Sequence, residues 1–308
     1  MINISSFVRN VVIFVIFCLF FATYCSASVG DKSQYFKNCL RRCTEENCTS
    51  NPASCDCEYE CMWRTTQKFI ERGWKIPQFR GKWPFIRLFG MQEPASVLFS
   101  FFNLFAHAKG ILKFRREVPS KAPYWHMWHV FATICINAWL WSIVFHTKDT
   151  PTTELLDYGC AYMMVISSFY CMVARIASLY KRTAIWRVLL ALGLFAFYMN
   201  HFVFLTFYQD YGYNMKVNII TGTAAGTGWI VWYMGQRKNK PYAYKIAIFV
   251  VLSALSLGWE VFDFPPILDT FDAHALWHLS TAPLVSLLYS FMIDDSKYLY
   301  ESEKSKQE

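Results

Sequence analysis

Long apolar segments dominate this chain and make a lipid bilayer its natural solvent. Hydrophobic residues make up 55% of the 308 residues and charged residues only 17%, so a water-soluble globule would expose too much apolar surface. Each segment is long enough for a helix across a hydrocarbon core of roughly 30 Å. We therefore predict an all-α membrane protein whose seven-transmembrane helix bundle occupies residues 95–293. The seven segments lie near residues 95–112, 125–146, 157–180, 184–206, 214–235, 241–262 and 273–293.

The formal net charge of +8 does not indicate a nucleic-acid-binding protein. Its cations stand in short runs between apolar segments, where they report topology, and no basic domain exists to bind a phosphate backbone. Because short cytoplasmic loops carry the excess of Lys and Arg, we expect the first, third and fifth loops to be cytoplasmic. The tail, residues 294–308, is then also cytoplasmic, and its polarity predicts disorder. The cations of these loops are Lys109, Lys113, Arg115, Arg116, Lys121, Lys181, Arg182, Arg237, Lys238 and Lys240.

Residues 1–27 have the layout of a secretory signal peptide. Arg9 precedes an apolar run from Val11 to Cys25, and small residues follow it. The run is short for a comfortable span, although an uncleaved anchor that adds an eighth helix is the alternative. A cleaved signal peptide places residues 28–94 in the lumen, in agreement with the charges of the loops.

Residues 28–94 form a cysteine-rich lumenal domain and a connector. Six cysteines in so short a segment, in an oxidising compartment, predict a disulfide framework of three bridges, with the connectivity open. A zinc knot is the alternative, but the spacings do not match paired CxxC motifs. Asn47 opens an N-glycosylation triplet, which agrees with a lumenal location. The candidate disulfide cysteines are Cys39, Cys43, Cys48, Cys55, Cys57 and Cys61.

Five polar residues are expected at the lumenal ends of three spans. Ser142 and His146 stand four residues apart near the end of the second segment and share a helix face. Asp157 opens the third segment, and His274 and His278 repeat the four-residue spacing at the start of the seventh. Ionisable groups in membrane spans are costly and tend to mark function.

Three histidines in this arrangement predict a catalytic zinc site. His146, His274 and His278 would be the ligands and would leave the fourth tetrahedral position for water, whose pKa zinc lowers to about 7. Asp157 is then the candidate base, and Ser142 a hydrogen-bond donor to the water or the developing oxyanion. Two alternatives stay open: each residue alone serves helix packing, or Ser142 is itself a nucleophile that His146 and Asp157 activate.

Ordered motifs along the chain resemble known membrane hydrolases. The Ser-x3-His, Asp and His-x3-His pattern is similar to the CREST superfamily, which includes alkaline ceramidases. Seven further motifs resemble the post-GPI-attachment-to-proteins factor 3 family and cover the whole mature chain. They are CEYECMW (57–63), GKWPF (81–85), QEPAS (92–96), NAWLWS with VFHTKDT (137–142 and 144–150), YGYN (211–214), DFPP (263–266) and DAHALWHLST (272–281).

The resemblance implies an enzyme of GPI-anchor lipid remodelling in the Golgi membrane. Its implied reaction is zinc-dependent hydrolysis of the sn-2 acyl ester in the phosphatidylinositol of GPI-anchored proteins, as by a GPI-specific phospholipase A2. The alternatives are a ceramidase-like lipid amidase and a non-enzymatic receptor or chaperone for GPI-anchored proteins. Lys304 and Lys306 resemble a dilysine retrieval signal, so the endoplasmic reticulum is the alternative location. The oligomeric state stays open.

Overall fold

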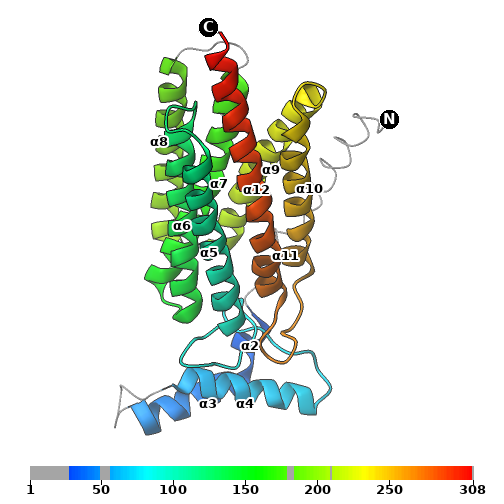
Figure 1. Cartoon of the computed structure of the whole chain (residues 1–308). Helices are drawn as coiled ribbons and strands as arrows, with labels where there is room; N and C mark the ends of the chain where they lie inside the picture. Colours follow the sequence, from blue (N-terminus) through cyan, green and yellow to red (C-terminus); the bar gives the residue numbers. More distant parts are fainter. Residues whose placement is uncertain (1–27, 49–55, 179–183, 209, 307–308) are drawn as a thin grey trace.

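The chain is built almost entirely of helices. The computed structural model describes residues 28–48, 56–178, 184–208 and 210–306 (Figure 1). Within these ranges the backbone pairs as β-structure only at isolated bridges, which close short turns between helices. The predicted signal peptide, residues 1–27, lies outside the described residues.

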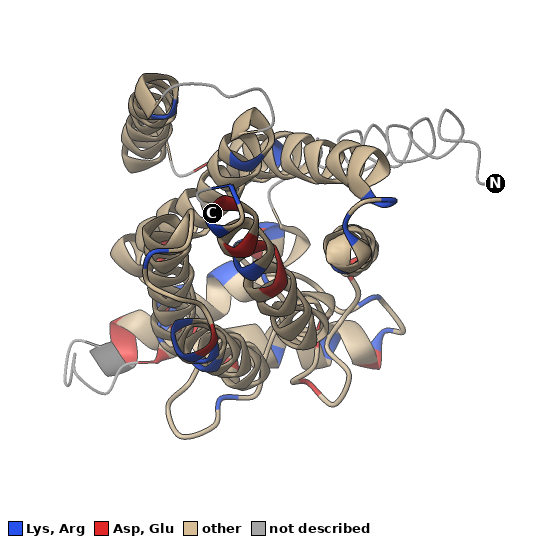
Figure 2. Cartoon of the chain, turned by 45° about the horizontal axis from the view of Figure 1, so that its top comes forward, with Lys and Arg blue, Asp and Glu red and all other residues tan. Residues whose placement is uncertain are grey.

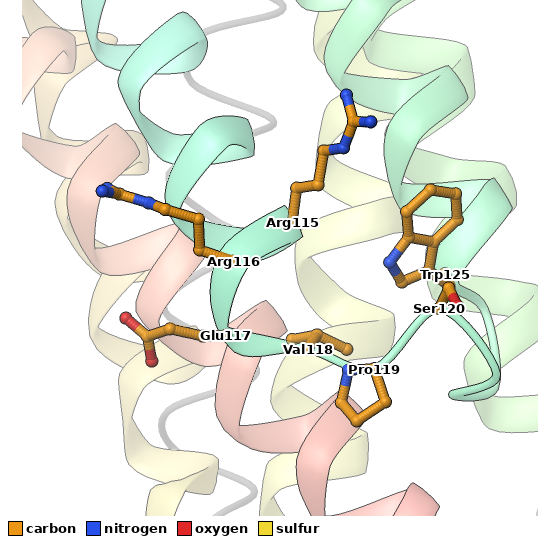
Figure 3. A pocket seen from close by; sticks show the side chains of 7 residues that line it. All are labelled: Arg115, Arg116, Glu117, Val118, Pro119, Ser120 and Trp125. Atoms are coloured by element: carbon orange, nitrogen blue, oxygen red, sulfur yellow. The ribbon is translucent and has the colours of Figure 1, made fainter.

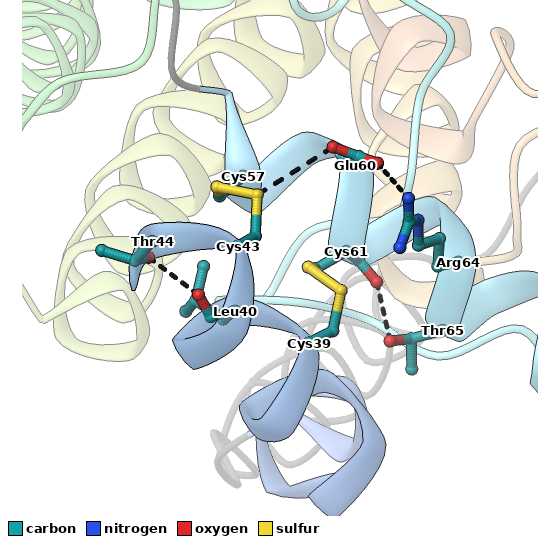
Figure 4. Close-up of a disulfide and its surroundings, with 9 residues drawn as sticks. All are labelled: Cys39, Leu40, Cys43, Thr44, Cys57, Glu60, Cys61, Arg64 and Thr65. Atoms are coloured by element: carbon teal, nitrogen blue, oxygen red, sulfur yellow. Dashed lines mark hydrogen bonds and ion pairs between the residues drawn. A yellow bond between two sulfur atoms is a disulfide. The ribbon is translucent and has the colours of Figure 1, made fainter. Parts of the chain in front are cut away.

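Four helical segments form an N-terminal domain, residues 28–72, that lies across one end of the bundle in Figure 1. Cysteines at i and i+4 share one face of each long helix, so two antiparallel helices are joined by two bridges, Cys39–Cys61 and Cys43–Cys57 (Figure 4). The side chain of Cys48, the whole of Cys55 and the side chain of Asn47 lie outside the described part, so the third bridge and the glycosylation stay predictions. The segments are α2 (Val29–Lys32), α3 (Gln34–Cys43), the π-helix η1 (Thr44–Cys48) and α4 (Cys57–Glu71).

All seven predicted apolar segments are helical. Among the described residues, six helices are long and apolar enough to cross a membrane, by length and composition. The seventh, α9, has 26 residues but is not among these six, because its glycines, threonines and asparagines lower its hydropathy. The helices are α5 (Pro94–Glu117), α6 (Trp125–Thr147), α7 (Pro151–Ala177), α8 (Ala184–Tyr208), α9 (Tyr211–Gln236), η4 (Pro241–Ala243) with α10 (Tyr244–Ser256) and α11 (Gly258–Phe262), and α12 (Ala273–Lys304).

Six of these helices pack in a closed ring. The order of neighbours is α5, α6, α7, α9, α10 and α12, and α12 returns to α5 (Figure 1). The main apolar core, which includes Trp128, Phe291 and Met292, fills the half of the ring far from the N-terminal domain. Helix α8 packs outside the ring on α7 and exposes Ile185 and Phe195, as expected for a surface that faces lipid.

The predicted disorder of the tail from residue 294 is wrong for most of its length, because α12 continues to Lys304. Asp295 is buried, and its carboxylate accepts two hydrogen bonds from Arg175 of α7, at 2.6 and 2.8 Å. The hydroxyl of Tyr242 donates a third, at 2.8 Å. Contacts to two other elements therefore hold these polar turns helical, and the red segments on the last helix in Figure 2 mark their acidic residues.

Candidate metal centre

Three histidines meet at the end of the bundle next to the N-terminal domain, which we call the histidine end. His146 lies in the last turn of α6, and His274 and His278 lie one turn apart at the start of α12. The side chain of Asp272 accepts a hydrogen bond from the backbone N–H of Ala275 at 2.9 Å and so fixes where α12 begins. The sequence predicted all three histidines to meet, and the structure brings them together.

The three imidazoles point one nitrogen each toward a common centre. His274 Nε2 lies 2.9 Å from His278 Nε2 and 3.4 Å from His146 Nε2, and one ligand atom from each histidine lies within 4.8 Å of the others. Neutral ring nitrogens that face each other through their lone pairs repel unless a cation or proton lies between them. Three imidazoles are a donor set that suits Zn²⁺, so these residues fit the metal that the sequence predicts.

The opposite nitrogen of each ring has its own partner. His146 Nδ1–H donates to Glu93 Oε2 at 2.7 Å, and His274 Nδ1–H donates to Glu260 Oε1 at 2.5 Å. His278 Nδ1 lies 2.8 Å from the hydroxyl oxygen of Ser100. Carboxylates and hydroxyls bound to the second nitrogen fix the tautomer and the ring orientation of metal-binding histidines. The Nε2 lone pairs are thereby directed to the centre.

These three partners, Glu93, Glu260 and Ser100, were not among the residues predicted from the sequence. Glu260 carried a usable signal, since it is an ionisable residue inside a predicted span. Glu93 directly precedes α5, and Lys82 lies 2.6 Å from it. Burial alone would raise the pKa of Glu93, but the charge of Lys82 and the hydrogen bond from His146 hold it well below its usual range. The centre therefore contains a carboxylate that stays ionised near neutral pH.

Ser142 is buried beside the centre but does not contact a histidine directly. Its hydroxyl oxygen lies 3.0 Å from that of Ser100, which in turn contacts His278. No hydrogen bond joins Ser142 to His146 within the described residues, and His146 already bonds Glu93. This geometry does not favour the alternative in which His146 activates Ser142 as a nucleophile.

Asp157 lies in the second turn of α7, close enough to the centre to act on it electrostatically. A capping box between Thr150 and Thr153 begins this helix and so sets the height of Asp157. Its carboxylate interacts electrostatically with His146 and His274, but it is not part of the group of converging ligand atoms. Asp157 thus lies near the centre without belonging to the group of converging ligand atoms.

A hollow of about 500 Å³ lies at the other end of the bundle and is not part of this site. Figure 3 shows Arg115 and Arg116 at the C-terminal end of α5, with their side chains pointing in different directions. Since α5 has 24 residues, about 35 Å of helix separates this hollow from Glu93. The arginines cannot contribute to the histidine centre.

The fold and the site define a helical membrane protein with a three-histidine candidate metal centre at one end of a closed helix ring. Residues 40–296 match the Per1-like family, and the chain belongs to this family.

Curated relatives confirm the resemblance seen in the motifs. "Post-GPI attachment to proteins factor 3" of Drosophila melanogaster is 45% identical over 87% of this chain and 89% of its own length. "GPI-specific phospholipase A2-like PGAP3" of Danio rerio is 40% identical over 91% of this chain and 94% of its own. The Homo sapiens protein of the same name is 36% identical over 92% and 94%. No solved structure matches the chain significantly.

Proposed function

We propose that this protein is a membrane-embedded, zinc-dependent lipid hydrolase of GPI-anchor remodelling. Its reaction would be hydrolysis of the sn-2 acyl ester in the phosphatidylinositol of GPI-anchored proteins. The observation that carries the proposal is the convergence of three Nε2 atoms whose rings are each fixed through Nδ1. The names of the relatives, "GPI-specific phospholipase A2-like", support the substrate class.

His146, His274 and His278 would hold the zinc ion, which supplies an activated water nucleophile at neutral pH. Asp157 would accept the proton of that water. The Ser100 and Ser142 hydroxyls would form a short relay that ends beside the reacting ester, with Ser142 as the donor to its carbonyl oxygen. All of these side chains belong to residues that the structure describes.

Aromatic rings flank all three imidazoles and would form the apolar surroundings of the acyl chain. Such rings exclude water and strengthen the electrostatic interactions of the site. Trp141 stands four residues before Phe145 on α6 and so shares its helix face. The pairs of ring and imidazole, with their centroid distances, are Trp139 with His278 at 5.2 Å, Phe145 with His146 at 5.1 Å and Trp277 with His274 at 5.6 Å.

We place the histidine end and the N-terminal domain on the lumenal side of the Golgi membrane, with the endoplasmic reticulum membrane as the alternative. This orientation would bring the centre to the leaflet that carries GPI-anchored proteins, whose lipid is the substrate. The described basic loops support it, because they lie at the end of the bundle that faces away from the histidines.

The test is fatty-acid release by the purified protein from a phosphatidylinositol-based GPI, before and after chelation and zinc repletion. We expect chelation to abolish release and zinc to restore it. His274→Ala should lose both bound zinc and release, because a catalytic site needs all three ligands. Asp157→Ala should keep zinc while turnover falls by about 10²- to 10⁴-fold, as for loss of a general base. His126→Ala, at the other end of α6, is the matched control and should behave like wild type.

Three results would contradict the proposal. Full release by metal-free protein would exclude zinc chemistry. Release from ceramide, and not from the GPI ester, would favour the amidase alternative, while tight GPI binding without any release would favour a receptor.

A further inference from the structure

The connector segment 78–83 is held to the N-terminal domain by several contacts. The backbone N–H of Gly30 donates to the carbonyl of Gln78 at 2.9 Å, and that of Gly81 donates to the hydroxyl of Ser28 at 2.6 Å. The ring of Phe79 packs against Phe36, with 4.9 Å between ring centroids, in the same small core as the Cys39–Cys61 bridge. The position of this segment therefore depends on the disulfide-linked helices.

The same segment also places the side-chain cation of Lys82 next to the candidate metal centre. Lys82 Nζ lies 2.6 Å from Glu93 Oε1 and 2.8 Å from Asp149 Oδ2, and 4.1 Å above the ring of Phe145. Glu93 uses its other oxygen, Oε2, to accept from His146 Nδ1. Lys82 is therefore one carboxylate away from a candidate zinc ligand, although it belongs to another part of the chain.

The buried position of the Glu93 carboxylate depends on the positive charge of Lys82. The side chain of Glu93 is 8% exposed, and a carboxylate that is buried without a compensating charge is costly. His146 is neutral when Nε2 binds a metal, so Lys82 is then the full positive charge in contact with Glu93 among the described residues. Without Lys82, Glu93 would turn toward solvent or another donor, and His146 would lose the partner that orients it.

We propose that Lys82 is a positioning residue that holds Glu93, and through it His146, in the metal-binding orientation. The disulfide-linked N-terminal domain thereby supports a candidate metal centre whose histidines stand on α6 and α12. This inference rests on the proposed function in one respect, which is that the three histidines bind zinc.

The experiment measures zinc bound per protein, by elemental mass spectrometry, across a series of chelator concentrations. Lys82→Met keeps the aliphatic stem and removes the charge, and we expect it to lose zinc at about 10- to 100-fold lower chelator concentration than wild type. Lys82→Arg keeps the charge and should restore most of the affinity. Arg80→Met is the matched control: Arg80 lies in the same segment, but its side chain is 74% exposed and pairs with Glu58 at 2.9 Å. It should retain zinc as wild type does.

A double-mutant cycle with Glu93→Gln separates positioning from general loss of fold. The amide oxygen of this variant would still accept from His146, but the amide carries no charge for Lys82 to neutralise. Adding Lys82→Met to Glu93→Gln should therefore change the zinc affinity little further. Helical circular dichroism and the two mapped disulfides should be unchanged in every variant.

Wild-type zinc retention by Lys82→Met, or effects that simply add in the cycle, would overturn the inference alone. A wild-type protein that binds no zinc would overturn the proposed function as well.

Discussion

The hydroxyl groups of Ser100 and Ser142 lie 3.0 Å apart, but they occupy different places in the centre. Ser100 contacts His278 Nδ1, so it can fix the ring only if its oxygen stays in place. Ser142 lies one hydroxyl further from the imidazole; where Ser100 donates to Ser142, the Ser142 proton is left for a substrate oxygen, as the proposed role requires. Replacing Ser100 or Ser142 by alanine should therefore affect zinc binding and hydrolysis differently.

Ser100→Ala should weaken zinc binding by about 10- to 100-fold, because it removes the partner of a ligand imidazole. Ser142→Ala should keep zinc and lose only part of the hydrolysis, by up to about 10³-fold, as for one oxyanion donor. Metal analysis and fatty-acid release on the same preparations would check both. An acyl group trapped on Ser142, with no residual hydrolysis in its alanine variant, would show that Ser142 is a nucleophile instead.

The sequence predicted the centre in part. Helical spacing and the expected topology were enough to bring His146, His274 and His278 to one end, since the spacing follows from helical periodicity and the topology from the charges of the loops. The roles of Glu93 and Ser100 were not predicted, because they depend on how α5 is rotated against its neighbours. The periodicity within one helix does not determine that rotation. Asp157 interacts electrostatically with His146 and His274, while its place in the site and its contribution to catalysis stay predictions.

Helix α12 is the element on which most of the bundle converges. It carries two of the histidines at its start and the buried Asp295 near its end, and it packs against both α5 and α10. Inside it, Pro283 cannot donate to the carbonyl of Leu279, and Asn103 of α5 donates to the neighbouring carbonyl, that of His278, at 2.7 Å. Side chains from a neighbouring helix thus stabilise the turn that holds a candidate ligand.

Replacing Asp295 by alanine should destabilise the protein strongly. Its side chain and that of Arg175 are each 1% exposed, and removal of one partner of a buried ion pair costs about 3–5 kcal/mol. Asp294→Ala is the control, because Asp294 pairs with Lys245 at a more exposed position and should cost about 1 kcal/mol or less. Thermal unfolding in detergent measures the difference. Equal stabilities of the two variants would argue that the Arg175 charge finds another partner.

The sequence predicted which apolar segments are helical, but it did not predict where α12 ends. Apolar length located all seven helices, because a hydrocarbon core requires it. The extension of α12 to Lys304 was missed because its polar turns owe their helicity to Arg175, Tyr242 and other distant residues. The disulfide connectivity could not be predicted from the sequence either, because it follows from how α3 lies against α4.

At the scale of the whole molecule, the described basic loops and the three histidines lie at opposite ends of the helix bundle. The described basic loops that follow α5 and α9 lie away from the histidine end, as Figure 2 shows from the side of the C-terminus. We expect an epitope at Glu308 to be cleaved by protease added to sealed microsomes, and the N-terminal domain to be protected. The N-terminal epitope should become sensitive only after detergent. The reverse pattern would invert the protein and remove the centre from the lumenal leaflet.

The closed ring of helices has a consequence for biogenesis. The ligands stand on α6 and α12, and the groups that orient them stand at the start of α5 and on α11, so no pair of neighbouring helices contains a finished centre. If the centre binds zinc, a chain whose helices are inserted but not yet assembled would have no complete set of ligands for the ion. Metal capture would then be the last event of maturation, and the fraction of protein that carries the ion would report how much of it has completed assembly in the bilayer.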